Sequence, residues 1–169
     1  MPNTPTGLAR FNALDPGDAE KELLACCASP AFAGPVAAGR PFADEEALAE
    51  AAAAAVRGLA WPDVLEALSA HPRIGERAGG ASRESSWSRQ EQSGVEEHLR
   101  ASLSEGNLAY ERRFGHVYLV CATGLTGAEM LRRLRERLDA DEEGERRTVR
   151  EELAKITRLR VGKLVGEAP

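Results

Sequence analysis

The stretch from Asp44 to Leu59 constrains the fold of this chain more strongly than any other part of the sequence. It opens with three consecutive acidic residues and continues as a nearly unbroken run of alanine. Alanine has the highest intrinsic helix propensity, and carboxylates in a first turn interact favourably with the helix dipole. The pattern predicts a helix here and a fold that must bury one helical face.

Similar patterns predict helices along most of the chain. Asp15-Pro16 is a cap followed by a favoured first helical residue, and Thr126-x-x-Glu129 has the form of a capping box. The apolar run 117–122 fits either a buried strand or an extended core segment. The predicted helices cover the stretches 15–27, 44–59, 62–68, 88–103, one that begins near Gly106-Asn107, 126–138, and one from the acidic corner 139–145 to Val165.

The remaining stretches lack helical spacing. Residues 1–10 are predicted to be a loose lead-in, and residues 76–85 a loop that either covers a pocket or is a plain connection. The sequence has neither a repeat nor a domain linker, and 169 residues suit one domain. We therefore expect an all-α, single-domain bundle over residues 1–169, with about seven to nine helices and a pocket at helix ends.

Composition argues against nucleic-acid and membrane partners. The 22 basic and 27 acidic side chains give a net charge of −5, which offers no electrostatic footprint for nucleic acid. The arginines between Arg132 and Arg137 alternate with Glu129 and Glu136 at helical spacing, which indicates a solvated, ion-paired face. No apolar run approaches the roughly 18 residues of a membrane span, and no signal-peptide core is visible, so we expect a cytoplasmic protein.

The three cysteines, Cys26, Cys27 and Cys121, show neither a CxxC motif nor Cys/His ligand spacing. This pattern predicts no disulfide framework and no metal site. Cys121 lies in an apolar run, where a buried thiol is the default and a nucleophile is the alternative.

The segment His71-Pro72-Arg73-Ile74-Gly75 concentrates polar groups that core packing does not require. Pro72 cannot continue a helix, so the His71 imidazole is expected at a helix end. An imidazole titrates near pH ~6.5 and can donate or accept a proton at cellular pH. A histidine that simply ends a helix at the surface is the alternative interpretation.

A second polar group follows at Ser88, Glu91 and Gln92. Because Ser88-x-x-Glu91 precedes an apolar periodic run, it is also a capping box, in which hydroxyl and carboxylate bind the free amides of a helix start. Both interpretations stay open from the residues alone. Together with His71, however, this group indicates a site for acid/base chemistry.

Three motifs occur in the order in which one family has them: His71-Pro72-x-Ile74-Gly75, then Ser88-x-x-Glu91-Gln92-Ser93-Gly94, then Asn107-x-x-Tyr110-x-x-x-Phe114-Gly115. The chain resembles the OHCU decarboxylases, which act on 2-oxo-4-hydroxy-4-carboxy-5-ureidoimidazoline in the cofactor-free last step from urate to (S)-allantoin. The resemblance extends over nearly the whole chain, from Phe11 through Cys26 and Arg40-Pro41-Phe42 to Ile156–Arg160.

The resemblance implies a small ureido-imidazoline substrate whose carboxylate is attached to a tetrahedral ring carbon beside a C=N bond. Loss of CO₂ leaves an electron pair that the ring imine delocalises, so this chemistry needs neither metal nor cofactor. The protein must orient the carboxylate, stabilise charge on the ring and supply a proton. The resemblance implies that His71 is the proton donor, and that Glu91 fixes its tautomer or binds ureido N–H groups.

Further substrate contacts are implied in the same way. Ser88 and Gln92 supply polar contacts, Pro72 shapes the wall of the site, and the backbone at Thr123 and Gly124 holds substrate oxygens. The family is commonly a homodimer, so the resemblance also implies a homodimer here.

Arg160 lies toward the side of the last predicted helix that carries its apolar stripe. A half-buried arginine needs an anion, and a structural Asp or Glu is the plain alternative to a substrate. The resemblance assigns Arg160 to substrate binding, with Arg158 as the fallback. The stripe expected to face the core consists of Val149, Leu153, Ile156, Leu159 and Leu164.

One stretch departs from the family pattern. Many animal and plant members have Phe-Gly-Phe-Pro-Phe and then an arginine, where this chain has Phe-Gly-His-Val-Tyr at 114–118 and Thr123. His116 and His98 therefore remain alternatives for acid/base work. Two other functions also stay open: a different cofactor-free enzyme on a cyclic ureide, such as a hydrolase or racemase, and a non-catalytic helical interaction module.

Overall fold

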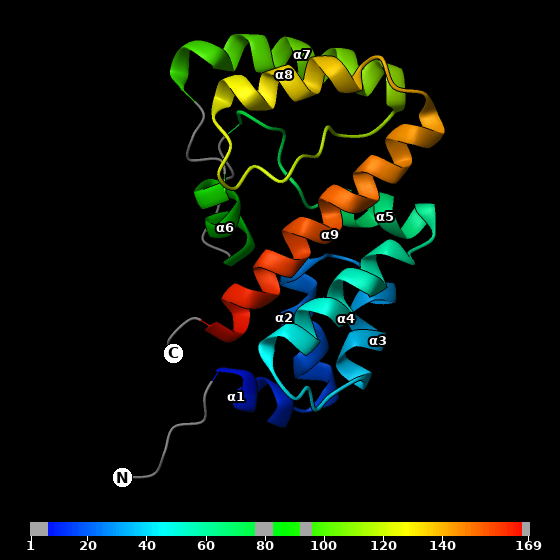
Figure 1. Cartoon of the computed structure of the whole chain (residues 1–169), viewed down its shortest axis with the longest axis vertical. Coiled ribbons are helices and arrows are strands. Elements are labelled where there is room, and N and C mark those ends of the chain that lie inside the picture. The colour runs from blue at the N-terminus through cyan, green and yellow to red at the C-terminus, as the bar shows by residue number, and fades with distance from the viewer. Residues whose placement is uncertain (1–6, 77–82, 92–95, 167–169) are drawn as a thin grey trace. The chain divides into compact units, whose positions relative to one another are not determined.

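The computed structural model describes residues 7–76, 83–91 and 96–166 of the chain. Within these ranges it contains nine α-helices, one 3-10 helix and no strand, which confirms the all-α prediction (Figure 1). The helices are α1 (Gly7–Ala13), α2 (Pro16–Cys26), α3 (Pro30–Ala38), α4 (Glu45–Arg57), α5 (Trp61–Leu68), α6 (Arg83–Glu91), the 3-10 helix η1 (Glu97–Leu99), α7 (Arg100–Phe114), α8 (Gly127–Arg137) and α9 (Glu142–Gly166).

The chain divides into two compact units. Unit 1 comprises Met1–Val64 and Ala154–Pro169, and unit 2 comprises Leu65–Leu153. Helices α5 and α9 each contribute residues to both units.

In unit 1, α4 begins where the sequence predicts. The Asp44 side chain caps it by accepting a hydrogen bond from the Ala47 amide at 2.7 Å. Helix α2 begins at Pro16, and the Asp15 carbonyl rather than its side chain accepts the first helical bond, from the Ala19 amide at 2.9 Å. Both helix starts follow the expected placement of cap residues and proline.

Arg40 and Asn12 tie the end of α1 to the segment after α3. The Arg40 guanidinium donates to the carbonyl oxygens of Phe11 (2.8 Å) and Leu14 (2.7 Å). The Asn12 amide exchanges two hydrogen bonds with the Phe42 backbone, at 3.0 and 2.9 Å. The motif residue Arg40 therefore has a structural role, because its guanidinium binds backbone carbonyls in and just after α1.

Helix α9 buries most of its predicted stripe: Val149, Leu153, Ile156 and Leu164. The expectation for Leu159 is wrong, because this side chain is 42% exposed. Arg160, four residues after Ile156, takes the buried position instead and is 1% exposed. Arg160 follows Leu153 by seven residues, close to two full turns, so it lies on the buried stripe, whereas Leu159 follows Leu153 by six residues and is turned away from the stripe.

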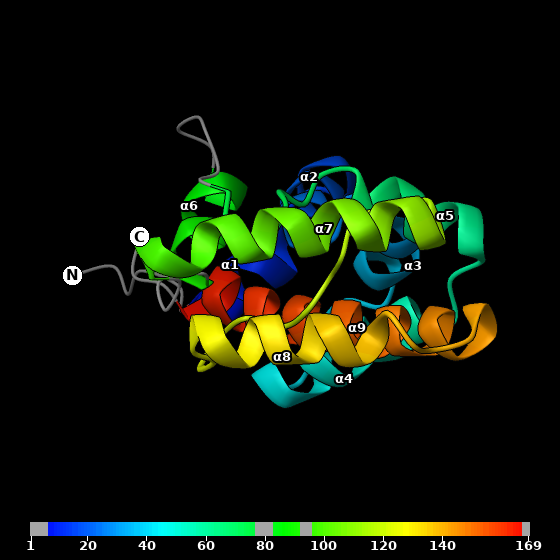
Figure 2. The same cartoon turned by 90° about the horizontal axis from the view of Figure 1, so that it is seen from above.

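In unit 2, α7 and α8 lie side by side, as both views show (Figures 1 and 2). A Cβ on Gly106 of α7 would come within 2.4 Å of Leu134 Cδ2 on α8, so glycine permits this close approach. The predicted helix boundary near Gly106-Asn107 is therefore wrong, since this glycine serves packing and α7 continues through it. The core of this unit contains Ile74, Leu103, Tyr110, Tyr118, Val120, Ala122, Met130, Leu131 and Leu134.

The segment 117–122 is an extended core segment, with neither helix nor strand assigned to it. Its side chains are buried, apart from the partly buried Val117 and Cys121. The expectation of a solvated arginine face on α8 holds for Arg132, whose side chain is 66% exposed, but is wrong for Arg137, whose side chain is 11% exposed. Arg137 has a buried carboxylate partner, Glu145 on α9, which spacing along α8 could not reveal.

Helix α6 also differs from the prediction. It begins at Arg83, inside the stretch expected to be a loop, and ends at Glu91. Ser88 therefore lies within a helix, and the interpretation of Ser88-x-x-Glu91 as a helix-starting capping box is wrong. Trp87 and Ser88 are buried, at 2% and 3% exposure, so tertiary packing of this helix overrides the local cap signal.

Candidate active site

The His71 turn, residues 71–76, follows directly on α5. The His71 amide donates to the Leu68 carbonyl at 3.0 Å, which closes the last turn of the helix, and Pro72 then prevents its continuation. The imidazole is half-buried, and its Nε2 atom is shielded from solvent. The prediction that His71 lies at a helix end is confirmed.

Helix α7 holds the His71 turn through side chains on one of its faces. Asn107 Nδ2 donates to the Ile74 carbonyl at 2.8 Å, and Arg100 Nη1 donates to the Gly75 carbonyl. Because these α7 residues are seven positions apart, they lie two turns apart on the same face. The backbone downstream of His71 is therefore fixed by two side-chain donors.

Gly75 meets this same face with a backbone that favours glycine. Its φ is +92°, and a Cβ there would lie 3.3 Å from Leu103 Cβ. A side chain would be strained by the positive φ and crowded by Leu103. This explains why glycine ends the motif His71-Pro72-x-Ile74-Gly75.

Arg73 completes the attachment of the His71 turn to α7 with a bidentate ion pair. Its Nε and Nη2 atoms contact the two carboxylate oxygens of Glu111 at 2.9 and 3.1 Å, and Nη1 contacts Glu76 at 3.3 Å. Hydrogen bonds to Glu111 and then Glu76 raise the pKa of Arg73 above its ordinary value. Arg73 is therefore a permanent cation at this place.

A pocket of about 480 Å³ opens between the end of α5 and the end of α7, within unit 2. This volume is in the range of small-molecule sites. His71 and Pro72 line it together with Arg73, Glu111 and His116. The pocket thus combines two imidazoles, a guanidinium and the carboxylates of Glu76 and Glu111 with apolar walls, which suits a small polar ligand.

His116 comes from the segment after α7. Its Nδ1 lies 3.1 Å from the Val117 carbonyl, and its ring packs edge-on against Tyr110 at 5.5 Å between centroids. His98, the other alternative for acid/base work, is exposed and lies 3.4 Å from the Glu96 carboxylate. Of the two, the structure brings only His116 into the pocket of His71.

The other residues predicted for the site lie at several places. Glu91 is the half-buried last residue of α6, and Gln92 lies outside the described residues. Thr123 and Gly124 are exposed in the turn before α8, where Gly124 has a φ of +81°. Arg160 belongs to unit 1, as does its fallback Arg158, which contacts Glu50 at 3.0 Å and also pairs with Glu46.

Sequence reasoning did not single out Glu111 and Asn107 as supports of the His71 turn. Their signal was present in the motif that begins at Asn107 and in the four-residue spacing to Glu111, which places both on one helix face. The sequence could not show that these two side chains contact the His71 turn.

The model of the OHCU decarboxylase family matches residues 12–162, across both units. The chain belongs to the OHCU decarboxylase family. The matched range includes the His71 turn and the whole of α7.

Two curated relatives support the assignment to the OHCU decarboxylase family. The chain is 36% identical over 155 residues to the uric acid degradation bifunctional protein TTL of Arabidopsis thaliana, covering 88% of this chain and 48% of that protein. It is 30% identical over 141 residues to the 2-oxo-4-hydroxy-4-carboxy-5-ureidoimidazoline decarboxylase of Amia calva, covering 80% and 81%. The chain therefore spans about half the length of the bifunctional relative.

Solved structures show the same fold. A crystal structure of OHCU decarboxylase determined in the presence of (S)-allantoin matches with a TM-score of 0.74 and 31% identity, covering 86% of this chain and 98% of that one. A crystal structure of (S)-allantoin synthase matches with a TM-score of 0.69 at 19% identity, covering 95% and 54%. The second likeness concerns the fold alone.

Membrane-spanning helices and metal-ligand clusters are both absent from the described part of the chain. No helix in it is both long and apolar enough to span a membrane. Nor do its residues include three or more His, Cys, Asp or Glu side chains placed to hold a metal ion. Its three cysteines form no disulfide; Cys26 and Cys27 are buried and Cys121 is half-buried.

Proposed function

We propose that this protein decarboxylates OHCU to (S)-allantoin in urate degradation, without a cofactor, and that His71 is its proton donor. The observation that carries the proposal is the match, over 86% of this chain, to an OHCU decarboxylase crystallised in the presence of (S)-allantoin. Its support within this chain is the pocket that His71 and Pro72 line at the end of α5.

In the proposed reaction the bond between the ring carbon and the carboxylate breaks, and CO₂ leaves. The electron pair of that bond passes into the adjacent C=N of the ring, so the substrate is its own electron sink. A proton from His71 then reaches the neighbouring, ureido-bearing carbon of the former C=N on one face, and the hydroxyl on the carbon that lost CO₂ gives up its proton to become the carbonyl of allantoin. The ring nitrogen and the imidazole take up protons from water. General acid catalysis by a positioned side chain typically contributes about 10²–10⁴-fold to a rate.

The other assigned residues have supporting roles in this proposal. Glu91 orients the imidazole or binds ureido N–H groups, and Ser88 and Gln92 supply polar contacts. The backbone at Thr123 and Gly124 binds substrate oxygens. Pro72 contributes apolar wall, and Arg160 binds the substrate anion. These roles follow from the resemblance of the motifs to the family.

The test supplies freshly generated OHCU to the protein and follows CO₂ release together with the circular dichroism of (S)-allantoin. We expect both signals above the spontaneous rate, and a loss of about 10²–10⁴-fold in kcat for His71→Asn. Activity should persist after treatment with EDTA. Ureide hydrolysis or racemisation without CO₂, or wild-type turnover by His71→Asn, would contradict the proposal.

We further propose that the protein is a homodimer, as the family resemblance implies, and that it works in the cytoplasm, the location expected from its sequence. Size-exclusion chromatography with light scattering tests the oligomeric state, for which we expect twice the 18.1 kDa chain mass. A mass equal to that of one chain at micromolar concentration would contradict the dimer.

A further inference from the structure

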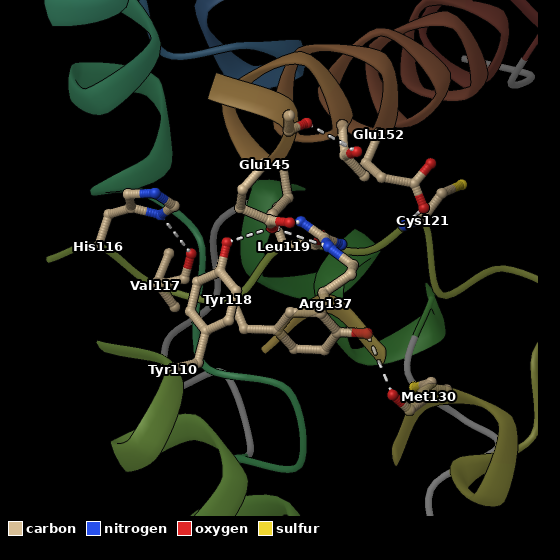
Figure 3. Close-up of polar contacts among 12 residues, drawn as sticks. Tyr110, His116, Val117, Tyr118, Leu119, Cys121, Met130, Arg137, Glu145 and Glu152 are labelled. Carbon is tan, nitrogen blue, oxygen red and sulfur yellow. Dashed lines mark hydrogen bonds and ion pairs between the residues drawn. The ribbon is translucent and has the colours of Figure 1, made fainter. Parts of the chain in front are cut away.

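Behind the extended segment 117–122, unit 2 contains a buried charged cluster that the proposed chemistry does not use. We call it the Arg137 cluster: Arg137, Glu145, Tyr110 and the Leu119 carbonyl (Figure 3). Arg137 Nε donates to Glu145 Oε1 at 2.8 Å, and Arg137 Nη2 and the Tyr110 hydroxyl donate to the same oxygen. Arg137 Nη1 donates to the Leu119 carbonyl.

Both charges of the cluster are buried, with side-chain exposures of 11% for Arg137 and 1% for Glu145. Burial opposes the positive charge, but the hydrogen bonds and charge of Glu145 outweigh it and keep the pKa of Arg137 above its ordinary value. Burial, and then the bond to Glu145, raises the pKa of Tyr110 well above its ordinary range. The cluster therefore keeps one pattern of donors throughout the cellular pH range.

The cluster does not have the form that stability alone would favour. A buried ion pair returns roughly what its desolvation costs, and apolar residues of similar volume often stabilise as well. All three donors also converge on Glu145 Oε1, while Oε2 is buried and has no hydrogen-bond partner among the described residues. Leaving a buried acceptor unsatisfied costs about 1–3 kcal/mol. This arrangement fits a role in orienting neighbouring groups better than a role in stabilising the fold.

What the cluster fixes is the backbone of the extended segment. Outside helices and strands, buried backbone groups must find other partners. Here the Leu119 carbonyl accepts a hydrogen bond from Arg137, and the Cys121 amide donates to Glu152 Oε1 of α9 at 3.4 Å. The Tyr118 ring lies under the guanidinium, 4.9 Å from Arg137 Cζ. Side chains of α8 and α9 thus replace the neighbouring strand that this segment lacks.

The fixed segment leads directly into the turn that carries Thr123 and Gly124. The Leu125 amide donates to the Ala122 carbonyl at 3.0 Å, and Gly124 adopts a left-handed backbone. The direction of the amides in this turn therefore depends on where residues 119–122 are held.

We propose that Arg137 and Glu145 are positioning residues, which hold the Leu119–Gly124 backbone so that the amides of this turn face the substrate. The inference rests on the proposed function. Neither side chain takes part in the chemistry; each acts through the backbone that it fixes.

The test compares Arg137→Met, Arg137→Lys and the double variant Arg137→Met/Glu145→Met with wild type. Leu131→Ala is the matched control, because Leu131 is buried on the same helix and its side chain has no hydrogen bond to the segment. We expect Arg137→Met to lose at least ~10-fold in kcat/KM and Arg137→Lys to lose less. The double variant should regain thermal stability but not kcat/KM, whereas Leu131→Ala should lose stability but keep kcat/KM below its melting temperature.

A second measurement does not depend on activity. In ¹⁵N spectra, the Gly124 amide signal should shift in the Arg137 variants and stay in place in Leu131→Ala. A double variant with wild-type kcat/KM, or an unshifted Gly124 signal in folded Arg137→Lys, would overturn the proposal. If wild type fails to decarboxylate OHCU while the Gly124 signal shifts, the proposed function fails and the positioning of the turn stands.

Discussion

The Asn107 side chain links α7 directly to the His71 turn. It is buried, and its amide donates to the Ile74 carbonyl at 2.8 Å. Asn107→Leu leaves that carbonyl without its donor, which should cost about 1–3 kcal/mol in the free energy of unfolding. We also expect a lower kcat, because the backbone after His71 is released. Urea denaturation and steady-state kinetics measure the two effects.

Leu108→Ala is the control for Asn107→Leu, since Leu108 is the next residue on α7 and is 48% exposed. It should change the free energy of unfolding by less than about 0.5 kcal/mol. If Asn107→Leu behaves like this control in both measurements, the side-chain link is not what holds the turn.

Glu91 can now be tested as an active-site carboxylate without the complication of a capping box. It is the last residue of α6, where a negative charge is unfavourable to the helix dipole. Glu91→Gln should therefore leave stability unchanged or slightly raised. If Glu91 is a partner of His71, the variant Glu91→Gln should lose at least ~10-fold in kcat/KM. A thermal melt and a progress curve for allantoin formation decide between the roles, and a destabilised, fully active variant would exclude the catalytic one.

At the residue scale, the sequence placed His71 correctly at a helix end, because Pro72 after a helical run leaves few other conformations. It misjudged Arg137 because i,i+4 spacing along α8 reveals only neighbours on the same helix. The partners that bury Arg137 are Tyr110 and Glu145, which come from α7 and α9. Only the fold brings them together.

At the scale of elements, helices with strong local signals were predicted well. The start of α4 and the capping box of α8 depend on contacts within four residues, which sequence displays directly. The limits of α6 and α7 depend instead on packing: Trp87 is buried in one, and Gly106 allows close contact with Leu134 in the other. Ser88 and Gly106 were therefore misread as boundaries.

The capping box of α8 gives a pH-dependent prediction. Thr126 Oγ1 accepts from the Glu129 amide at 3.1 Å, and Glu129 accepts from the Thr126 amide at 3.3 Å. These hydrogen bonds, that of the Thr126 backbone first, lower the pKa of Glu129 below its ordinary 4.5. Its contribution to stability is therefore present above pH 4.5 and disappears as the pH falls through the lowered pKa.

Melting temperatures from pH 7 to pH 3 test this expectation. Thr126→Ala should cost about 1 kcal/mol at pH 7, as typical N-caps do. The difference between wild type and Glu129→Gln should shrink as the solution is acidified. A difference that stays constant or grows toward low pH would contradict the assigned role of the carboxylate.

At the scale of the whole molecule, the two units raise the question of one domain or two. Each contains one of the two tryptophans, Trp61 in unit 1 and Trp87 in unit 2. Helix α9 is continuous from Glu142 to Gly166 and contributes buried side chains to both units, Leu153 to one and Ile156 to the other. Because helix formation is cooperative, we predict that the units unfold together.

The single-tryptophan variants Trp61→Phe and Trp87→Phe report on the two units separately. Their urea midpoints, followed by fluorescence, should each coincide with the midpoint that far-UV circular dichroism gives for the same variant. Coinciding probes are the mark of a two-state transition. A fluorescence midpoint that precedes the dichroism midpoint would instead show two independently folding domains, contrary to the single domain expected from sequence.

The two units also differ in when their parts become available during synthesis. Unit 2 is one uninterrupted stretch, whereas unit 1 needs the residues that follow Ala154. Gly7 of α1 meets the end of α9 so closely that a Cβ would lie 1.8 Å from the Val165 carbonyl oxygen. On the ribosome, α1 must therefore remain without this neighbour until residues 65–153 have all emerged. Although N-terminal parts usually fold first, α1 can be completed only after α9 has been made.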